Sequence, residues 1–258
     1  MFPPISHRRR ALVTGSSRGI GAAVAATLAG DGYAVAVHCR AERVAAETVA
    51  AGLAGAGHAV VAGDIGDPEE ARAVVAGAVD ALGGLDLLVN NAAAHAHHPI
   101  TETGYADWQA GWQRVVGVNL LGTANVTWCF VDHLVHRGEG PAGGRIVTVG
   151  SRGAYRGEPT ALAYGASKAG EHALTQSLAV ALAPLGIGVA AVAPGFVRTD
   201  MATGVLAGPA GDAIRAQSPY GRVAEPEEVA AAVAWLASPA SQWASGAVVD
   251  LNGASYLR

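Results

Sequence analysis

The sequence lacks several features that would each indicate a particular kind of protein. Only two of its 258 residues are cysteine, Cys39 and Cys129, and they fall in different apolar segments. This excludes a disulfide scaffold and favours a reducing compartment. No apolar run reaches the roughly 18 residues needed to cross a bilayer, and the start of the chain has no apolar signal core. We therefore expect a cytoplasmic protein that neither spans a membrane nor is secreted.

Positive charge is also scarce. Lysine and arginine together number 17 against 21 acidic residues, and the net charge is −4. No broad basic patch is visible, so a nucleic-acid partner is not expected. With 51% hydrophobic residues and neither repeat nor linker, the chain is predicted to be one globular domain over 1–258, preceded by a loose N-terminal arm at 1–9.

The scarcest basic residue is lysine, which occurs once. Lys168 follows Tyr164 by four residues. Residues four apart on a helix share a face, with Cβ atoms about 6 Å apart. A cation at that distance favours phenolate over phenol, so that Tyr164 can donate and accept a proton near neutral pH. An ordinary pair on a helix surface is the alternative interpretation.

A glycine-rich turn opens the chain. The apolar run 11–13 is typical of a buried strand, the turn 15–21 follows it, and an alanine-rich helix is expected over 22–29. Glycines let the backbone approach a pyrophosphate, and a helix N-terminus supplies free N–H groups and a positive dipole end. The order predicts a dinucleotide-phosphate site. A turn that is glycine-rich only for tight packing is the alternative.

The end of the second predicted strand, 33–39, indicates which dinucleotide binds. An NAD site would place Asp or Glu about 20 residues beyond the glycine turn. This chain has His38, Cys39 and Arg40 there, and Arg18 lies in the turn itself. Two guanidiniums suit a 2′-phosphate, so we expect NADP(H) to be preferred over NAD(H). Because Glu42 stands close by, two solvated surface arginines remain the alternative.

The alternation of strands and helices continues to the end of the chain. Further strands are expected over 58–64, 85–90, 145–150, 187–193 and 247–250. Further helices are expected over 41–54, from Asp67 onward, and over 107–136, 164–183 and 225–237. This order predicts an α/β fold: a single-domain, Rossmann-type, doubly wound, seven-stranded parallel sheet with helices on both faces. Ligands in such sheets bind outside the carboxyl ends of the strands, where this chain carries Gly15, Arg40, Asp64, Asn90, Ser151 and Pro194.

Three polar positions leave two interpretations open. Asp64 can accept a hydrogen bond from an adenine amino group, or it can cap the helix that Asp67 opens. Asn90 can tie neighbouring backbone together or contact a ligand. Asn119 lies in the middle of a predicted helix, where asparagine is unfavourable, so it bends the helix locally or holds a water.

Two segments are predicted to border the substrate. His95, His97 and His98 lie in the loop after the fourth strand, but that loop offers no further metal ligand, so we expect a rim of the substrate opening and no metal site. The segment at about 195–225, rich in glycine and proline, is expected to act as a lid. The charged loop 152–160 favours a polar or anionic part of the substrate.

Together these motifs resemble the classical short-chain dehydrogenases/reductases over essentially the full chain, in the branch similar to 3-oxoacyl-[acyl-carrier-protein] reductases. The matching motifs are Thr14-Gly15-x-x-x-Gly19-Ile20-Gly21, Asn90-Asn91-Ala92, Asn119, Ser151, Tyr164-x-x-x-Lys168, Pro194-Gly195-x-x-x-Thr199 and Asp250-x-Asn-Gly253. The sequence departs from the family at Ala93, where glycine is usual.

The resemblance implies hydride transfer between NADP(H) and a carbonyl or secondary alcohol. The catalytic residues would be Asn119, Ser151, Tyr164 and Lys168. Tyr164 would pass the proton, Ser151 would donate a hydrogen bond to the carbonyl oxygen, and Lys168 would hold the nicotinamide ribose. Asn119 would hold a water that links Lys168 to solvent, while the hydride chemistry belongs to the cofactor.

The resemblance also implies the cofactor-binding residues and the assembly. The residues are Gly15, Ser17, Arg18, Gly19, Ile20, Gly21, Arg40, Asp64, Ile65, Asn91, Ala92, Tyr164, Lys168, Pro194, Gly195, Val197 and Thr199. A homotetramer, or a dimer, is implied. Two other functions share the fold: a non-catalytic dinucleotide sensor, which could dispense with the Tyr–Lys pair, and a dehydratase or epimerase, whose extended forms usually carry a larger C-terminal domain.

Overall fold

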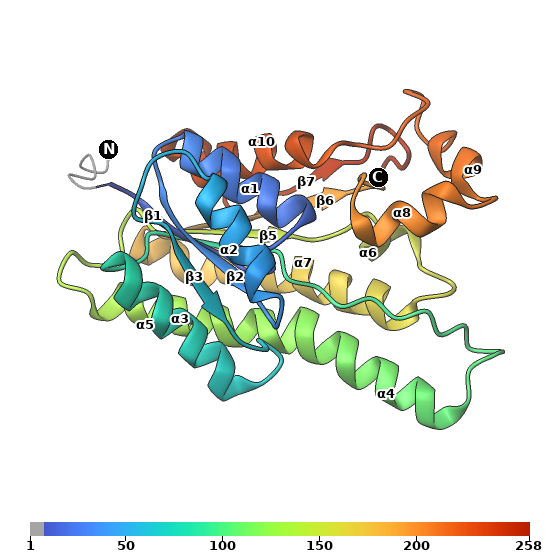
Figure 1. Cartoon of the computed structure of the whole chain (residues 1–258), viewed down its shortest axis with the longest axis horizontal. Coiled ribbons are helices and arrows are strands. Elements are labelled where there is room, and N and C mark those ends of the chain that lie inside the picture. The colour runs from blue at the N-terminus through green and yellow to red at the C-terminus, as the bar shows by residue number, and fades with distance from the viewer. Residues whose placement is uncertain (1–7) are drawn as a thin grey trace.

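The computed structural model, which describes residues 8–258, has one parallel β-sheet at its centre (Figure 1). Its seven strands pair in the order β3-β2-β1-β4-β5-β6-β7. The strands are β1 (Arg10–Val13), β2 (Ala34–Cys39), β3 (Ala59–Ala62), β4 (Leu87–Asn90), β5 (Arg145–Val149), β6 (Gly188–Pro194) and β7 (Val248–Leu251). The strand order reverses between β1 and β4, and sheets of this kind bind nucleotides at that point. The predicted doubly wound fold is confirmed.

Helices cover both faces of the sheet (Figure 1). One face carries α1 (Gly19–Gly30), α2 (Arg43–Gly52) and α10 (Pro226–Ala237). The other carries α3 (Pro68–Leu82), α4 (Tyr105–Val116), α5 (Thr123–His136) and α7 (Leu162–Leu182). The shorter helices are α6 (Gly153–Arg156), α8 (Asp200–Ala207) and α9 (Gly211–Arg215), with 3₁₀ turns at Ala183–Leu185 and Pro239–Ala244.

Successive residues of a strand point to opposite faces, so each strand feeds two cores. On β1, Ala11 and Val13 are buried in the core beneath α1 and α10, and Leu12 is buried in the core beneath α3 and α5. All three are fully buried, and burying a Val or Leu side chain contributes about 2 kcal/mol. Burial on both faces explains why these strands are apolar runs without polar alternation.

The segment expected as one helix over 107–136 is interrupted. A π-helix, Gly117–Gly122, joins α4 to α5 and has Asn119 inside it. A π-helical turn places an extra residue in the hydrogen-bond ladder, which is the local distortion that a mid-helix asparagine predicted. As expected, α3 is capped by the Asp67 side chain, which accepts from the N–H groups of Glu69 and Glu70. Asp64 therefore does not cap this helix.

Taken as one stretch, Tyr105–His136 is long and apolar enough to cross a membrane by length and composition alone, because an 18-residue window within it has a mean hydropathy of 1.2. A core helix of a soluble protein passes the same test. Here the stretch buries Val115, Val126 and Phe130 within the protein.

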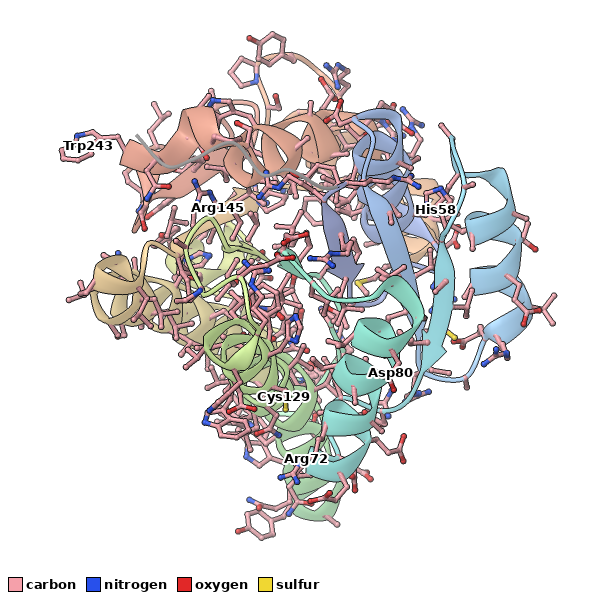
Figure 2. The ribbon with its side chains drawn as sticks, turned by 90° about the vertical axis from the view of Figure 1, so that its left-hand side faces the viewer. His58, Arg72, Asp80, Cys129, Arg145 and Trp243 are labelled. Carbon is pink, nitrogen blue, oxygen red and sulfur yellow. The ribbon has the colours of Figure 1, made fainter. Side chains whose placement is uncertain are left out.

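Elsewhere an apolar side chain is fully exposed: Trp243 projects away from the body of the molecule (Figure 2).

The structure adds detail to the N-terminal arm and to the segment 195–225. Residues 1–7 of the expected N-terminal arm lie outside the described residues, whereas Arg8 and Arg9 donate to the carbonyl oxygens of Gly32 and Ala237. The segment 195–225 contains the two short helices α8 and α9, which the sequence analysis did not predict. These helices follow β6, beyond the carboxyl ends of the strands (Figure 1).

Candidate active site

The glycine turn packs directly against the end of β4. Gly15 has a φ of +61°, and a Cβ on it would lie 2.8 Å from the Cα of Ala92. A Cβ on Gly21 would lie 2.5 Å from the Nδ2 of Asn91. Only glycine fits both positions, so the turn brings bare backbone to the point where the strand order reverses. That is the arrangement a pyrophosphate requires.

The asparagines at the end of β4, Asn90 and Asn91, hold this junction together. Thr14 Oγ1 accepts from the N–H groups of Asn91 and Ala92 at 2.9 and 3.0 Å. In return, Asn91 Nδ2 donates to the carbonyl oxygens of Thr14 and Gly15. Asn90 Nδ2 donates to Thr127 Oγ1 on α5. For Asn90 the structure therefore shows a contact that ties β4 to α5.

His38 has a part that the sequence analysis did not assign. The ring is buried at the end of β2, where its Nδ1 accepts from the Gly15 N–H at 2.9 Å and its Nε2 donates to Gly63 O at 3.0 Å. Burial lowers the pKa of His38, although the Gly63 carbonyl and Asp64 oppose the shift, so the ring is held neutral. His38 thus ties the glycine turn to β3.

The two arginines expected at the 2′-phosphate are both exposed. Arg18 stands at the N-cap of α1, in the glycine turn. Arg40 follows β2 directly, and its Nη1 lies 4.0 Å from Asp64 Oδ2. Ile65, which is next to Asp64, is buried against Gly122 of the π-helix. Arg40, Asp64 and Ile65 therefore form one rim at the carboxyl ends of β2 and β3.

The segment after β6 reaches the glycine turn. Thr199 Cγ2 lies 3.3 Å from the place where a Cβ on Gly19 would stand, so this threonine adjoins the glycine turn. Val197 is buried and forms a single parallel bridge with Ala224. Gly195 N–H donates to Leu251 O, which ties the end of β6 to β7. The structure thus brings the first and the last predicted cofactor motifs together.

Tyr164 and Lys168 lie on one face of α7. The Lys168 Nζ stands 5.8 Å from the centroid of the Tyr164 ring, and Lys168 is buried. Ser151 follows β5, and its Oγ accepts from the Gly153 N–H at 3.0 Å. Asn119 reaches the same helix, because its Nδ2 donates to Ser167 Oγ at 2.9 Å.

Lys168 has contacts that the sequence analysis did not expect. Its Nζ donates to Val149 O at 2.9 Å and to both carboxylate oxygens of Glu171 at 2.9 and 3.1 Å. Burial acts to lower the pKa of Lys168, but Glu171 and Tyr164 outweigh burial and raise it. Burial raises the pKa of Glu171 to about 7 against the opposing effect of Lys168. The signal was present in the sequence, since residues three apart also share a helix face.

The next residue, His172, is a further buried group that the sequence did not single out. Its ring lies 4.9 Å from that of Tyr155, and neither ring nitrogen has a hydrogen-bond partner among the described residues. Burial, with Lys168 and Arg258, lowers the pKa of His172 to about 4 even though Asp250 acts in the opposite direction. A neutral imidazole thus stands beside the buried Lys–Glu pair.

The histidine loop borders Tyr164. The His95 ring is 5.1 Å from the Tyr164 ring at an interplanar angle of 57°. Burial lowers the pKa of His95, and His97 and His98 add to the effect. His98 is buried, donates from Nδ1 to Ala96 O, and accepts at Nε2 from the Ala163 N–H. Residues 8–258 contain no group of three or more His, Cys, Asp or Glu side chains placed to hold a metal ion.

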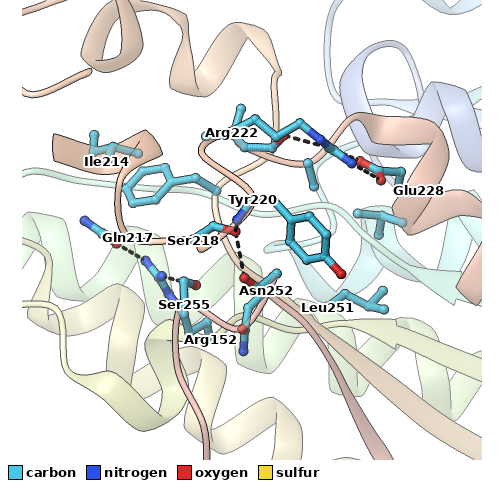
Figure 3. Close-up of a pocket in the computed structure, with 15 residues that line it drawn as sticks. Arg152, Ile214, Gln217, Ser218, Tyr220, Arg222, Glu228, Leu251, Asn252 and Ser255 are labelled. Carbon is cyan, nitrogen blue, oxygen red and sulfur yellow. Dashed lines mark hydrogen bonds and ion pairs between the residues drawn. The ribbon is translucent and has the colours of Figure 1, made fainter. Parts of the chain in front are cut away.

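A cavity of about 320 Å³ is lined in part by Arg152, the residue after Ser151 (Figure 3). Arg152 is buried in its wall, where the guanidinium donates to Ser255 Oγ and Gln217 Oε1 and lies over the Phe196 ring. Arg222 and Glu228 form an ion pair on the opposite side (Figure 3). Part of the charged loop 152–160 thus faces the segment that carries α9.

A doubly wound sheet, a glycine turn at its reversal point and a Tyr–Lys pair on one face of α7 are features of a dinucleotide-dependent oxidoreductase. The family described as enoyl-(acyl carrier protein) reductase matches residues 15–253. The chain belongs to this family, one of the short-chain dehydrogenases/reductases. Its enzymes act on CH–OH or carbonyl groups with a nicotinamide dinucleotide, and this chain is an oxidoreductase of that class.

Individual relatives agree over nearly the whole length. The chain is 35% identical to the 3-oxoacyl-[acyl-carrier-protein] reductase of Vibrio cholerae over 96% of this chain and 97% of that protein. A short-chain dehydrogenase from Burkholderia cenocepacia in complex with NADP is 34% identical, with a TM-score of 0.85 over 96% of this chain and 97% of that one. A 3-ketoacyl-(acyl-carrier-protein) reductase from Brucella melitensis complexed with NADH is 31% identical, with a TM-score of 0.86 over 96% and 98%.

Proposed function

We propose that this protein transfers a hydride between NADP(H) and a carbonyl or secondary-alcohol substrate, with Tyr164 as the general acid and base. One observation carries the proposal. The only lysine of the chain is buried with its Nζ 5.8 Å from the centroid of the Tyr164 ring, on a helix that follows β5. A positive charge so close to a phenol favours the phenolate form that a proton-transferring tyrosine must reach.

The residues at the crevice fit a dinucleotide. Gly15 and Gly21 pack against Ala92 and Asn91 where a Cβ would collide, so the turn presents bare backbone, and the N-terminus of α1 adds free N–H groups. When bound, the cofactor supplies the hydride chemistry. Lys168 holds the nicotinamide ribose, and the Val197 backbone and the Thr199 side chain hold the carboxamide. Asp64, Ile65, Asn91, Ala92, Pro194 and Gly195, with Ser17, Gly19 and Ile20 of the turn, complete the set of proposed contacts.

The substrate oxygen is received by two hydroxyl groups. Ser151 donates a hydrogen bond to the carbonyl oxygen, where negative charge develops as hydride arrives. Tyr164 gives its proton to the same oxygen in reduction and takes it back in oxidation. Asn119, buried in the π-helix, holds a water on the proton path from Lys168 to solvent. His95, which packs on the Tyr164 ring, forms part of the substrate rim.

We propose that NADP(H) is preferred over NAD(H). Arg18 and Arg40 are the exposed guanidiniums at the carboxyl ends of β1 and β2, and a 2′-phosphate suits such a pair. The nearby carboxylate of Asp64 is 4.0 Å from Arg40 and leaves this arginine only weakly paired. The Burkholderia relative in complex with NADP supports the proposal, and the Brucella relative complexed with NADH shows that both dinucleotides occur among similar proteins.

We also propose a cytoplasmic homotetramer, or a dimer, in which the segment 195–225 closes over the substrate. Apolar side chains stand exposed on α7, α5 and the preceding π-helix, among them Val180, Trp128 and Leu121. Exposed apolar surface of this kind marks protein–protein contacts. Cys39 and Cys129 are both free thiols, which fits a reducing compartment.

The experiment that tests the function is a substrate screen read by nicotinamide absorbance. Purified protein is mixed with NADPH and a panel of 3-oxoacyl thioesters, simple ketones, ketosugars and ketosteroids. The thioesters head the panel because the Vibrio cholerae relative is a 3-oxoacyl-[acyl-carrier-protein] reductase. We expect consumption of NADPH with at least one class. The proposal fails if NADP⁺ does not bind to the folded protein in a calorimetric titration.

A further inference from the structure

The ammonium of Lys168 is fully occupied by other protein groups. Its three acceptors are Val149 O and the two carboxylate oxygens of Glu171, at 2.9 to 3.1 Å. A lysine ammonium carries three N–H groups, so these contacts account for every proton that it can donate. We call Lys168 and Glu171 the buried pair, because their side chains are only 3% and 1% exposed.

The buried pair has no solvent to share its charge. Water cannot replace a partner at such a site, so each member depends on the other for its counter-charge. Within residues 8–258, the Glu171 carboxylate makes no hydrogen bond except those to Lys168. The carboxylate therefore holds two of the three donors of the ammonium, and the proposed reaction assigns it no role.

We infer that Glu171 is a positioning residue that competes with the nicotinamide ribose for the Lys168 ammonium. The inference rests on the proposed function, in which Lys168 holds the ribose hydroxyls. A hydroxyl can accept from Lys168 only when one of the three present bonds is given up. A charged Glu171 therefore weakens dinucleotide binding, whereas a protonated Glu171 accepts more weakly and releases the lysine.

The competition is pH-dependent in a window that can be reached experimentally. Burial raises the pKa of Glu171 to about 7, so its charge changes between mildly acidic and mildly basic solution. The other groups that face the pair are Tyr164 and His172, with Asp250 and Arg258 beyond the latter. His172 stays neutral in this window because its pKa is lowered to about 4. His95, which packs on Tyr164, also has a lowered pKa.

The test compares two ligands by isothermal titration calorimetry from about pH 6 to about pH 8.5. NADP⁺ contains the nicotinamide ribose, whereas adenosine 2′-monophosphate has the adenosine and the same titrating 2′-phosphate but no nicotinamide ribose. The ratio of their dissociation constants cancels the titration of the 2′-phosphate. In the wild-type protein we expect NADP⁺ to lose about fivefold in affinity, relative to the fragment, as the pH rises.

Two variants separate the charge of Glu171 from its packing. In Glu171→Gln, which keeps the shape and removes the charge, the ratio should be flat with pH and NADP⁺ should bind more tightly at about pH 8.5. Thr175→Val is the control, because Thr175 is buried one turn further along α7 and its hydroxyl, among the described residues, bonds only to the backbone carbonyl of Glu171. This control should keep the wild-type pH response.

The outcomes are distinct from those that test the function. If NADP⁺ binds the wild-type protein with a pH-independent ratio, or if Glu171→Gln keeps the wild-type response, the inference is overturned and the proposed function stands. If NADP⁺ does not bind the wild-type protein at all, the proposed function fails first. Because the wild-type measurement needs no substitution, the test remains decisive even if a variant does not fold.

Discussion

Asn119 holds both polar backbone groups of Ala94. Its Oδ1 accepts from the Ala94 N–H at 2.7 Å, and its Nδ2 donates to the Ala94 carbonyl at 3.0 Å. The same Nδ2 donates to Ser167 Oγ, which in turn donates to the Tyr164 carbonyl. One amide therefore joins the loop after β4, the π-helix and the helix of the Tyr–Lys pair.

We predict that Asn119→Ala lowers stability as well as turnover. The substitution leaves the N–H and the carbonyl of Ala94 buried without partners, which costs about 2–4 kcal/mol. Urea unfolding followed by circular dichroism measures the loss. Asn90→Ala is the comparison, because among the described residues the Asn90 side chain makes one hydrogen bond, to Thr127, and should lose less. Equal losses in the two variants would contradict the bridging role of Asn119.

Tyr164→Phe should remove turnover and keep cofactor binding. The phenol hydroxyl makes no hydrogen bond to the protein over residues 8–258, so stability should be unaffected, whereas the loss of a general acid costs about 10²–10⁴-fold in kcat. Steady-state kinetics and NADP⁺ titration measure the two effects. Tyr155→Phe is the matched control, since Tyr155 packs on His172 and Arg258 instead. Activity retained in Tyr164→Phe would mean that the proton comes from another group.

Arg40→Ala should lower the preference for NADPH over NADH. Losing one guanidinium–phosphate bond reduces kcat/KM with NADPH by about tenfold and leaves NADH nearly unchanged. Arg43→Ala is the control, because Arg43 is another exposed arginine, three residues later, that pairs with Glu47. If the wild-type protein used the two cofactors equally well, the role given to Arg18 and Arg40 would be withdrawn.

His172 should make the protein sensitive to mild acid. The unfolded state takes up a proton near the ordinary pKa of 6.5, whereas the folded state holds the ring neutral down to about 4. The contribution of His172 to stability is therefore fully present above pH 6.5 and is lost as the pH drops toward 4, by an amount on the order of 2 kcal/mol. The raised pKa of Glu171 acts in the opposite direction over this range, equally in the wild-type protein and in the variant, so the difference between the two isolates His172. Thermal melts of His172→Leu should lack this decline.

The control for His172 is His136→Leu, at an exposed histidine of α5 that lies beside Asp132. It should keep the wild-type acid sensitivity. A decline of the same size in His172→Leu would assign the effect to other groups.

A metal chelator should leave activity unchanged. Of the three loop histidines, His98 already uses both ring nitrogens, one on Ala96 O and the other on the Ala163 N–H. His95 packs on the ring of Tyr164. Assays before and after dialysis against a chelator test this expectation. A loss of activity that zinc restores would reopen the loop as a metal site.

The order of strands and helices could be predicted because it depends on local patterns. Buried strands such as Ala34–Cys39 are short apolar runs, and Asp67 with Pro68 marks a helix start by residue type alone. The glycine turn was also predictable, because Gly15, Gly19 and Gly21 lie between an apolar strand and an alanine-rich helix. Such signals need no knowledge of distant parts of the chain.

Other features depend on packing between distant segments and were missed. The segment with α8 and α9 is rich in glycine and proline, and its local sequence favours irregular structure. Lys168 and Glu171 are three residues apart on α7, so their pairing is local, whereas the burial of both side chains comes from other segments packed on this helix. The sequence places His38 at the end of a strand. Its hydrogen bond to the Gly15 N–H forms only because β2 lies beside β1.

Because β1 contributes side chains to both cores, two adjacent residues of this strand can report on the two cores separately. Leu12 faces the layer of α3 and α5, whereas Val13 faces the layer of α1 and α10. Isotope-labelled methyl groups at these two adjacent positions would report separately on the two halves of the molecule during unfolding. A ligand that stabilises only the half with the glycine turn would then shift the methyl resonance of Val13 and leave that of Leu12 unchanged.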